Sequence, residues 1–386
     1  PRACSRFHRL YGEPLRCGNF EVVVGRVILR VGVHDACRVA LCKHIRHFHR
    51  GKVIEAAHEA LDTDVIGYTN AFGIWELRQA IADHYDATYG VTVDPETVAV
   101  TTGSSGAFVL SFMAAFDPGD RVALASPGYP AYRNILTGLG VEVVDLPTTL
   151  EDNFQPTVAR LQALDTPPDG LILASPSNPA GTMISPKEME ALVVYCRQNG
   201  VRLISDEIYH GITYGAPGVT ALSHTRDAII INSFSKYFSM TGWRLGWMIV
   251  PGDLHRTIEC LAQNLFISPP TIAQQAGLAA FDCRDELEAN IRQYARSREL
   301  LLEKLPQAGF TRLAPAEGAF FIYADVSELT DDSRDLCRRM LAETGVAATP
   351  GVDFDPTRGG RFVRFSFAGD EGEIAEAADR LITWQR

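Results

Sequence analysis

From about residue 53 onward, short apolar runs alternate along the chain with stretches of helical periodicity. The apolar runs are β-rich and end at turn-forming residues, which is typical of strands buried on both faces of a sheet. Because helical stretches separate several of them, the pattern predicts an α/β fold with a mostly parallel, seven-stranded sheet covered by helices. The seven predicted strands are Val98–Thr102, Arg121–Ser126, Val141–Leu146, Leu171–Ser175, Val201–Asp206, Ala228–Ser233 and Leu245–Val250.

One of the intervening helices has clear boundary signals. It is expected at Pro186–Asn199, with Ser185 as the N-cap and Pro186 in the first turn. Parallel sheets of this kind bind ligands at the carboxyl ends of their strands. Residues that directly follow the apolar runs are therefore the first candidates for chemistry.

The pattern changes after about residue 285. A long charged helix is expected at Asp285–Leu305 and a final helix near Glu371–Trp384, with strands at Ala319–Ala324 and Phe362–Phe367 between them. This arrangement predicts a second, smaller α/β domain. The expected division is therefore a large domain over residues 52–284 and a small C-terminal domain over residues 285–386.

Composition narrows the classes of function. A chain of 386 residues with 46% hydrophobic content has enough material for two domains. Its net charge of -11 argues against binding to nucleic acid or to an anionic membrane. The longest apolar run, Ala107–Phe116, is too short to span a membrane, and the start lacks a clear signal-peptide pattern. The cysteines form no metal-site pairs, so we expect reduced thiols, no metal and a cytoplasmic location.

Residues 1–51 differ from the rest of the chain. They carry ten Lys and Arg against three Asp and Glu, whereas the remainder carries 26 against 44. They also contain four of the eight cysteines and five of the ten histidines, with weak periodicity. We expect an atypical leader that arises from out-of-frame translation or a wrongly placed start. The alternative is a metal-binding leader, although its spacings match no standard zinc pattern; the candidate ligands are Cys37, Cys42, His44, His47 and His49.

The strongest candidate for chemistry is Lys236, one of only five lysines in the chain. It lies just beyond the strand Ala228–Ser233, next to Ser235, and Arg244 follows eight residues later. A lysine in this position suits imine formation with an aldehyde cofactor. The hydroxyls of Ser233 and Ser235 and the Arg244 guanidinium would hold the cofactor's phosphate.

Two other interpretations of this motif stay open. Lys236 could be a surface lysine in a polar loop. The segment Ser233–Lys236 also matches the Ser-x-x-Lys motif of serine β-lactamases and penicillin-binding proteins, with Ser233 as nucleophile. The Lys-Thr-Gly motif that accompanies it in those enzymes is missing from this sequence.

A second motif, Ser205–Tyr209, follows the apolar run that ends at Ile204. A carboxylate here, Asp206, would keep the nitrogen of a pyridine cofactor protonated, so that the ring accepts electrons from a substrate carbanion. Tyr209 could hydrogen-bond the phenolic oxygen of such a ring. The alternative for Asp206 is an ordinary helix cap.

Two further loops follow apolar strands. In Ser175–Thr182, Asn178 could donate to the same phenolic oxygen, or the segment could be a simple Asn-Pro turn. Thr101–Ala107 is a small-residue loop that opens a helix, where backbone N–H groups bind phosphate well. It matches neither the Rossmann nor the Walker glycine pattern.

Taken together and in this order, the four motifs resemble those of class I/II aminotransferases, which are fold-type I pyridoxal-phosphate enzymes. Two more segments carry the resemblance near the N-terminal side. Tyr68 with Gly73 and Leu77–Arg78 matches the family's Tyr-x4-Gly-x3-Leu-Arg segment. Ser126–Pro130 matches the segment whose aromatic residue, here Tyr129, stacks on the cofactor ring.

The C-terminal segment Arg361–Ala368 completes the resemblance, which covers roughly residues 53–386. Its second arginine, here Arg364, grips the substrate carboxylate in the family. Within the family, the likeness is to actinobacterial enzymes of the aspartate aminotransferase-like or valine–pyruvate aminotransferase-like kind. The family's Gly-x-Pro-Asp-like turn, expected before the helix at Val53–Leu61, is missing here, which also sets the leader apart.

The resemblance implies a role for each matching residue. Lys236 forms the Schiff base with pyridoxal 5'-phosphate. Tyr68 reaches the phosphate of a neighbouring subunit, which implies a homodimer. Arg364 and Asn178 bind substrate, and Asp206 and Tyr209 join Asn178 around the pyridine ring. The phosphate is held by Ser104, Ser105, Ser233, Ser235 and Arg244.

The expected reaction is reversible amino transfer between an α-amino acid and a 2-oxo acid. Lys236 serves as general base and acid, and the kinetics are ping-pong. Gln263–Ile267 supplies no arginine for a second substrate carboxylate, which favours neutral or aromatic amino acids. Alternatives are another enzyme of the same fold, such as a carbon–sulfur β-lyase, or a homologue impaired by its N-terminal segment. A transcription regulator would need a helix-turn-helix in front, and the leader lacks that periodicity.

Overall fold

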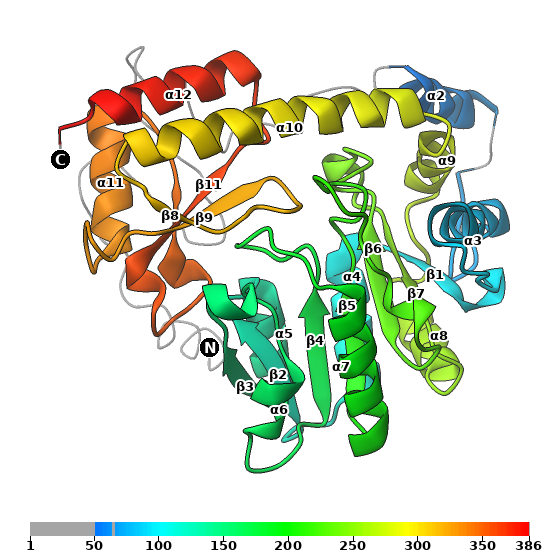
Figure 1. Ribbon diagram of the computed structural model, residues 1–386. Helices are drawn as coiled ribbons and strands as arrows, with labels where there is room; N and C mark the ends of the chain where they lie inside the picture. Colours follow the sequence, from blue (N-terminus) through cyan, green and yellow to red (C-terminus); the bar gives the residue numbers. More distant parts are fainter. Residues whose placement is uncertain (1–50, 64–65, 386) are drawn as a thin grey trace, which may run out of the picture. The chain divides into compact units, whose positions relative to one another are not determined.

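A computed structural model describes residues 51–63 and 66–385 of the chain (Figure 1). The atypical leader predicted for residues 1–51 therefore lies outside the described residues, except for Gly51. None of the helices in the described part of the chain has the length and apolar character needed to cross a lipid bilayer.

The larger sheet has seven strands in the order β1-β7-β6-β5-β4-β2-β3 (Figure 1). Strand β7 runs antiparallel to both of its neighbours, and the pairs from β6 to β3 are parallel. This confirms the mostly parallel sheet, and every strand end lies within one residue of its predicted position. The strands are β1 (Val98–Thr101), β2 (Arg121–Ser126), β3 (Glu142–Pro147), β4 (Gly170–Ala174), β5 (Arg202–Asp206), β6 (Ile229–Ser233) and β7 (Gly246–Ile249).

Alternate side chains of these strands enter two separate apolar clusters, one on each face of the sheet. In β4 and β5, Ile172 and Ile204 belong to the first cluster, whereas Leu171 and Leu203 belong to the second. This follows from the two-residue period of a strand. The associated helices are α2 (Lys52–Thr63), α3 (Trp75–Tyr89), α4 (Gly103–Ala115), α5 (Pro130–Leu139), α6 (Val158–Gln162), α7 (Pro186–Asn199), α8 (His255–Leu265) and α9 (Thr271–Ala280).

Different helices cover the two faces of the large sheet. Helix α4 places Phe108 and Phe112 in the first cluster, and α3 places Leu77 and Ile81 in the second. Helix α7 has the predicted bounds, and the Ser185 side chain accepts a hydrogen bond from the Glu188 backbone N–H, as expected of an N-cap. The helical layers on both sides leave the carboxyl edge of the sheet for the loops.

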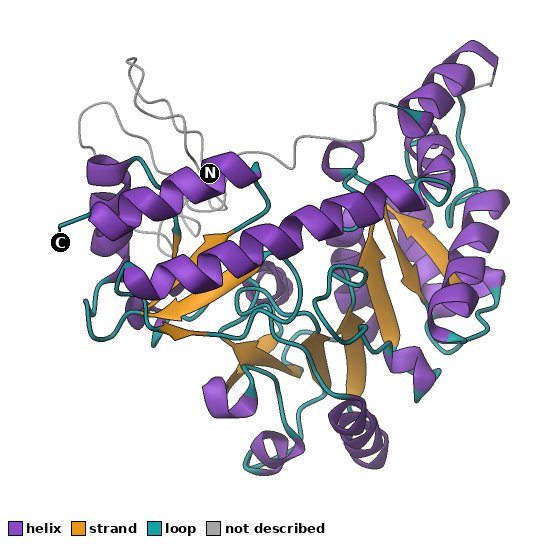
Figure 2. Ribbon diagram, turned by 45° about the horizontal axis from the view of Figure 1, so that its top comes forward, coloured by secondary structure: helices purple, strands orange, loops and turns teal. Residues whose placement is uncertain are grey.

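The smaller sheet is antiparallel and has the order β10-β11-β9-β8. Figure 2 shows the strands of both sheets in orange. Helix α10 packs along α12. The sequence predicted the two longer strands of this sheet and the two helices α10 and α12. It did not predict α11 or the two-residue strands. The elements are α10 (Arg284–Gln307), β8 (Arg312–Leu313), β9 (Phe321–Asp325), α11 (Ser333–Thr344), β10 (Thr349–Pro350), β11 (Phe362–Ser366) and α12 (Glu371–Thr383). The two sheets lie on either side of residues 284 and 285 in the sequence, and the domain boundary there stays a prediction.

Candidate active site

The predicted site residues of the large sheet gather at its carboxyl edge. Asp206 is the last residue of β5, and Ser233 is the last residue of β6, three positions before Lys236. Asn178 lies in the loop after β4, and Tyr129 lies between β2 and α5. Because β2, β4, β5 and β6 run parallel, their ends bring these side chains to one edge.

The Lys236 amine is enclosed by aromatic rings. Its Nζ lies 5.4 Å from the centroid of the Tyr209 ring and 5.7 Å from that of Phe320. Burial, together with the nearby Arg364 charge, lowers the pKa of this amine from 10.5 to about 8, although the Asp206 charge acts in the opposite direction. A fraction of the amine is therefore neutral and nucleophilic near neutral pH.

Asp206 is the matching buried acid, with 3% of its surface exposed. One carboxylate oxygen accepts a hydrogen bond from the Tyr132 hydroxyl, and the other accepts one from the Ile208 backbone N–H at 3.1 Å. Burial raises the pKa of the Asp206 carboxyl to about 6, and these hydrogen bonds and Lys236 oppose the rise. Above that pH a negative charge is held at the end of β5.

A cradle for an anion lies at the start of α4. Gly103 begins the helix with φ +73°, and a Cβ atom there would lie 2.6 Å from the Arg244 guanidinium. Ser104 and Ser105 follow it in the first turn of α4. Backbone N–H groups at the helix N-terminus and the guanidinium together suit a phosphate group.

The other side of the cradle is formed by the loop after β6. An Nη1 of Arg244 lies 3.5 Å from Ser235 Oγ and donates to the Thr241 carbonyl at 3.0 Å. The Ser233 hydroxyl accepts from the Ser235 backbone N–H and donates to the Leu245 carbonyl. Ser233 therefore shapes this loop, and its contact with phosphate stays a prediction.

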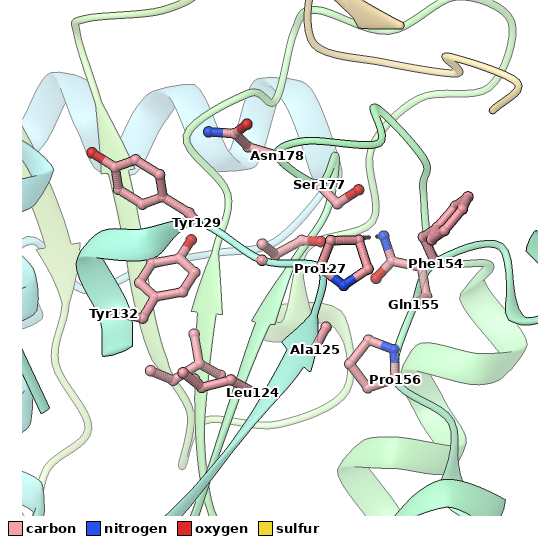
Figure 3. Close-up of a pocket in the computed structure, with 13 residues that line it drawn as sticks. Leu124, Ala125, Pro127, Tyr129, Tyr132, Phe154, Gln155, Pro156, Ser177 and Asn178 are labelled. Atoms are coloured by element: carbon pink, nitrogen blue, oxygen red, sulfur yellow. Dashed lines mark hydrogen bonds between the residues drawn. The ribbon is translucent and has the colours of Figure 1, made fainter. Parts of the chain in front are cut away.

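Tyr129, Tyr132 and Asn178 surround a small pocket at the carboxyl ends of β2 and β4 (Figure 3). The Tyr129 and Tyr132 rings meet edge to face, with centroids 5.4 Å apart. Tyr209 is buried and contacts Phe320 edge to face at 5.5 Å. These aromatic side chains make a largely apolar surrounding for the Asp206 charge.

Arg364 joins this group from β11 of the small sheet. Its Nη1 donates to Asn178 Oδ1 at 2.6 Å, and its Nη2 lies 3.3 Å from Thr349 Oγ1. The guanidinium carbon lies 4.2 Å from the centroid of the Phe321 ring and 4.7 Å from that of Phe354. A planar guanidinium held between rings is well suited to bind a carboxylate in a fixed direction.

Tyr68 is not brought to the other predicted residues in the described part of the chain. It is 83% exposed, in a segment tied to α9 by a hydrogen bond from Thr271 Oγ1 to the Gly67 carbonyl at 2.6 Å. A contribution to a neighbouring subunit is compatible with this exposure.

Sequence reasoning missed several residues that shape the site. Tyr132 lies in the first turn of α5, three positions after the N-cap Tyr129, and the two rings are in contact. Phe320, Phe321 and Phe354 carry no polar signal, because they act through packing. The described residues contain no cluster of His, Cys, Asp or Glu suited to a metal ion.

Comparison with known proteins identifies the class. The chain belongs to the class I and II aminotransferases, whose family model matches residues 46–381. Members of this family use pyridoxal phosphate, so the protein is a pyridoxal-phosphate-dependent aminotransferase of fold type I. The half-buried lysine, the buried acid and the anion cradle suit that cofactor.

The particular relatives point in the same direction. The chain is 52% identical to a valine–pyruvate aminotransferase from Mycobacterium tuberculosis, over 85% of this chain and 86% of that protein. A solved aminotransferase structure from the same organism gives a TM-score of 0.85 at 52% identity and covers 86% of this chain and 87% of that one. A putative aminotransferase structure from Silicibacter pomeroyi gives 0.83 at 45% identity and covers 98% and 94%.

The Tyr132–Asp206 hydrogen bond generates a pH prediction. Because this bond favours the carboxylate form, Tyr132→Phe raises the pKa of the Asp206 carboxyl further above 6. Cofactor binding that depends on the carboxylate is present above this pKa and weakens as the pH falls through it. The dissociation constant of pyridoxal phosphate is measured from about pH 8 down to pH 5. As the pH falls, it should begin to increase at a higher pH in Tyr132→Phe than in the wild-type protein.

Tyr195→Phe is the matched control, since Tyr195 is a buried tyrosine of α7 in the other apolar cluster. Its pH profile should coincide with that of the wild-type protein. Coincident profiles for wild type and Tyr132→Phe would contradict the assigned hydrogen bond.

Proposed function

We propose that Lys236 is the lysine that binds the cofactor and moves protons during amino transfer. The observation that carries the proposal is the half-buried Lys236, whose Nζ lies beside the Tyr209 and Phe320 rings and whose pKa is lowered to about 8, in the same site as the Asp206 carboxylate. Pyridoxal phosphate, when bound, supplies an aldehyde that condenses with amines and a ring that takes up electrons from the substrate α-carbon. Lys236 Nζ accepts the α-proton of the substrate and gives it up later in the same half-reaction.

The other residues hold the cofactor in this proposal. Asp206 would bind the ring nitrogen and keep it protonated, and burial of the carboxylate would strengthen that ion pair. Asn178 and Tyr209 would donate to the phenolic oxygen, and Tyr129 would stack on the ring. The phosphate is held by Ser104, Ser105, Ser233, Ser235 and Arg244. A second copy of the chain completes the phosphate site with its Tyr68, so we propose a homodimer, in the cytoplasm.

The substrates are a 2-oxo acid and an α-amino acid with a neutral side chain. Arg364 binds their shared carboxylate with the Nη groups that now face Asn178 and Thr349. The segment Gln263–Ile267 offers apolar side chains and no cation for a second carboxylate. The 52% identity to a valine–pyruvate aminotransferase supports a branched aliphatic donor.

A half-reaction tests the role of Lys236. Protein loaded with pyridoxal phosphate and given one amino acid, with no oxo acid, should convert the cofactor to its aminated form, as measured by absorbance. Lys236→Ala should slow this conversion by about 10²–10⁴-fold, the usual contribution of a positioned general acid–base group. Lys187 is an exposed residue of α7, so the control variant Lys187→Ala should behave like the wild-type protein.

Rapid conversion by Lys236→Ala would show that another residue moves the proton. If the wild-type protein bound the cofactor but failed to convert it whichever amino acid was supplied, the chain would be an impaired homologue.

A panel of amino donors tests substrate class. Valine should give a kcat/KM about tenfold or more above that of aspartate, because a second carboxylate would be buried without a partner. Arg364→Lys keeps the charge but loses the planar pair of donors, which should raise the KM of every donor by about 10–150-fold, or about 1.5–3 kcal/mol. Equal or better use of aspartate would contradict the neutral pocket, and an unchanged KM in Arg364→Lys would contradict the assignment of Arg364.

A further inference from the structure

A turn of the small sheet is attached directly to the large sheet next to the site. The segment 351–361 connects β10 to β11, and it approaches the carboxyl ends of β2 and β3. Phe354, in this turn, is one of the two rings against the Arg364 guanidinium. The turn therefore touches both the candidate carboxylate-binding arginine and the strand that leads to Tyr129.

Arg358 makes the attachment through two backbone carbonyls. Its Nη1 donates to the Thr148 carbonyl at 3.1 Å, and its Nη2 donates to the Ser126 carbonyl. Ser126 ends β2, and Thr148 directly follows β3. One guanidinium thus joins the ends of two neighbouring parallel strands to the turn.

Asp355 holds this guanidinium in place. The carboxylate is 2% exposed, and its Oδ2 accepts from Arg358 Nε at 2.8 Å. Its Oδ1 accepts from the backbone N–H groups of Thr357 and Arg358 at 2.9 and 2.8 Å. These three donors satisfy the buried carboxylate, which in turn holds the Arg358 guanidinium in one orientation.

A second hydrogen bond strengthens the same attachment. The Gly128 backbone N–H, next to Tyr129, donates to the Phe354 carbonyl at 3.0 Å. A Cβ atom at Gly128 would lie 2.4 Å from the Ala125 carbonyl oxygen, so the tight turn that follows β2 needs glycine at this position. The chain of contacts runs from β2 through Arg358 and Phe354 to Arg364.

We propose that Arg358, oriented by Asp355, is a positioning residue that sets Arg364 relative to the loop of Tyr129. In this proposal Arg364 of the small sheet binds the substrate carboxylate, and residues of the large sheet bind the cofactor ring. The contacts of Arg358, which we call the latch, keep these two groups at a fixed position relative to each other. The proposal rests on the proposed roles of Arg364 and Tyr129. It predicts that loss of Arg358 weakens carboxylate binding and leaves cofactor binding unchanged.

The experiment compares Arg358→Met with Arg361→Met in the cofactor-loaded protein. Arg361 is an exposed arginine of the same turn, so its replacement controls for charge and composition. The probe is 3-methylbutanoate, which carries the carboxylate of a branched substrate but no amino group. Its inhibition constant should rise about tenfold in Arg358→Met and stay within about twofold in Arg361→Met, with the pyridoxal phosphate dissociation constant unchanged in both.

A double-mutant cycle separates positioning from a general structural effect. In an Arg364→Lys background, Arg358→Met should add little further loss, because its effect acts through the Arg364 guanidinium. Arg358→Lys serves if the methionine variant does not fold; it keeps the charge but cannot reach all three acceptors, and should raise the inhibition constant several-fold.

An unchanged inhibition constant in a folded Arg358 variant, or a full additive loss in the Arg364→Lys background, would overturn the latch. A wild-type protein that does not bind 3-methylbutanoate, or an Arg364→Lys variant that binds it as well as wild type, would instead overturn the proposed role of Arg364.

Discussion

The site depends on placing an amine and a carboxylate together in a poorly hydrated position at the edge of a sheet. Burial is the largest cause that shifts the two pKa values toward each other, to about 8 for Lys236, where the Arg364 charge adds to it, and to about 6 for Asp206. The interval between them covers neutral pH, where Asp206 is ionised and Lys236 has a reactive neutral fraction. Aromatic rings lie beside the amine, and the Tyr132 hydroxyl and the Ile208 backbone N–H donate to the carboxylate.

The fold supplies that position in a direct way. Parallel strands bring Asp206, Ser233 and the loop of Asn178 to one edge, and helices on both faces exclude water from below. The aromatic rings of Tyr209 and Phe320 then cover the Lys236 amine. The turn before β9 contributes Phe320 and β11 contributes Arg364, so the enclosure exists only when both sheets are in place.

Because two sheets share the site, their relative placement matters as much as the residues themselves. The hydrogen bond from Arg364 to Asn178 connects the sheets across 186 positions of sequence. The Arg358 attachment makes a second connection at the ends of β2 and β3. We therefore infer that the Arg358 side chain, through its bonds to two backbone carbonyls, sets the position of the turn that carries Phe354 relative to the strand that leads to Tyr129.

Much of this could be predicted from the sequence, for identifiable reasons. Apolar runs with sharp ends located every strand of the large sheet, and the rule that ligands bind at strand ends selected Asp206, Asn178 and Lys236. Phe320 and Arg358 were not predicted, because their roles depend on contacts with segments that are distant in the sequence. No local pattern indicates such contacts. The two-residue strands β8 and β10 were missed since they are too short to show a period. The role proposed for Tyr68 requires a second copy of the chain, so it cannot be read from one chain alone.

The most direct test of the central claim is the titration of the Lys236 amine in the cofactor-free protein. Competitive acetylation at a series of pH values, read by mass spectrometry, reports each lysine separately, with exposed Lys187 as the internal reference. We predict half-maximal reactivity of Lys236 near pH 8. If Lys236 titrated near 10.5, the ordinary value for a lysine, the amine would not be desolvated and the proposed role of burial in this site would be wrong.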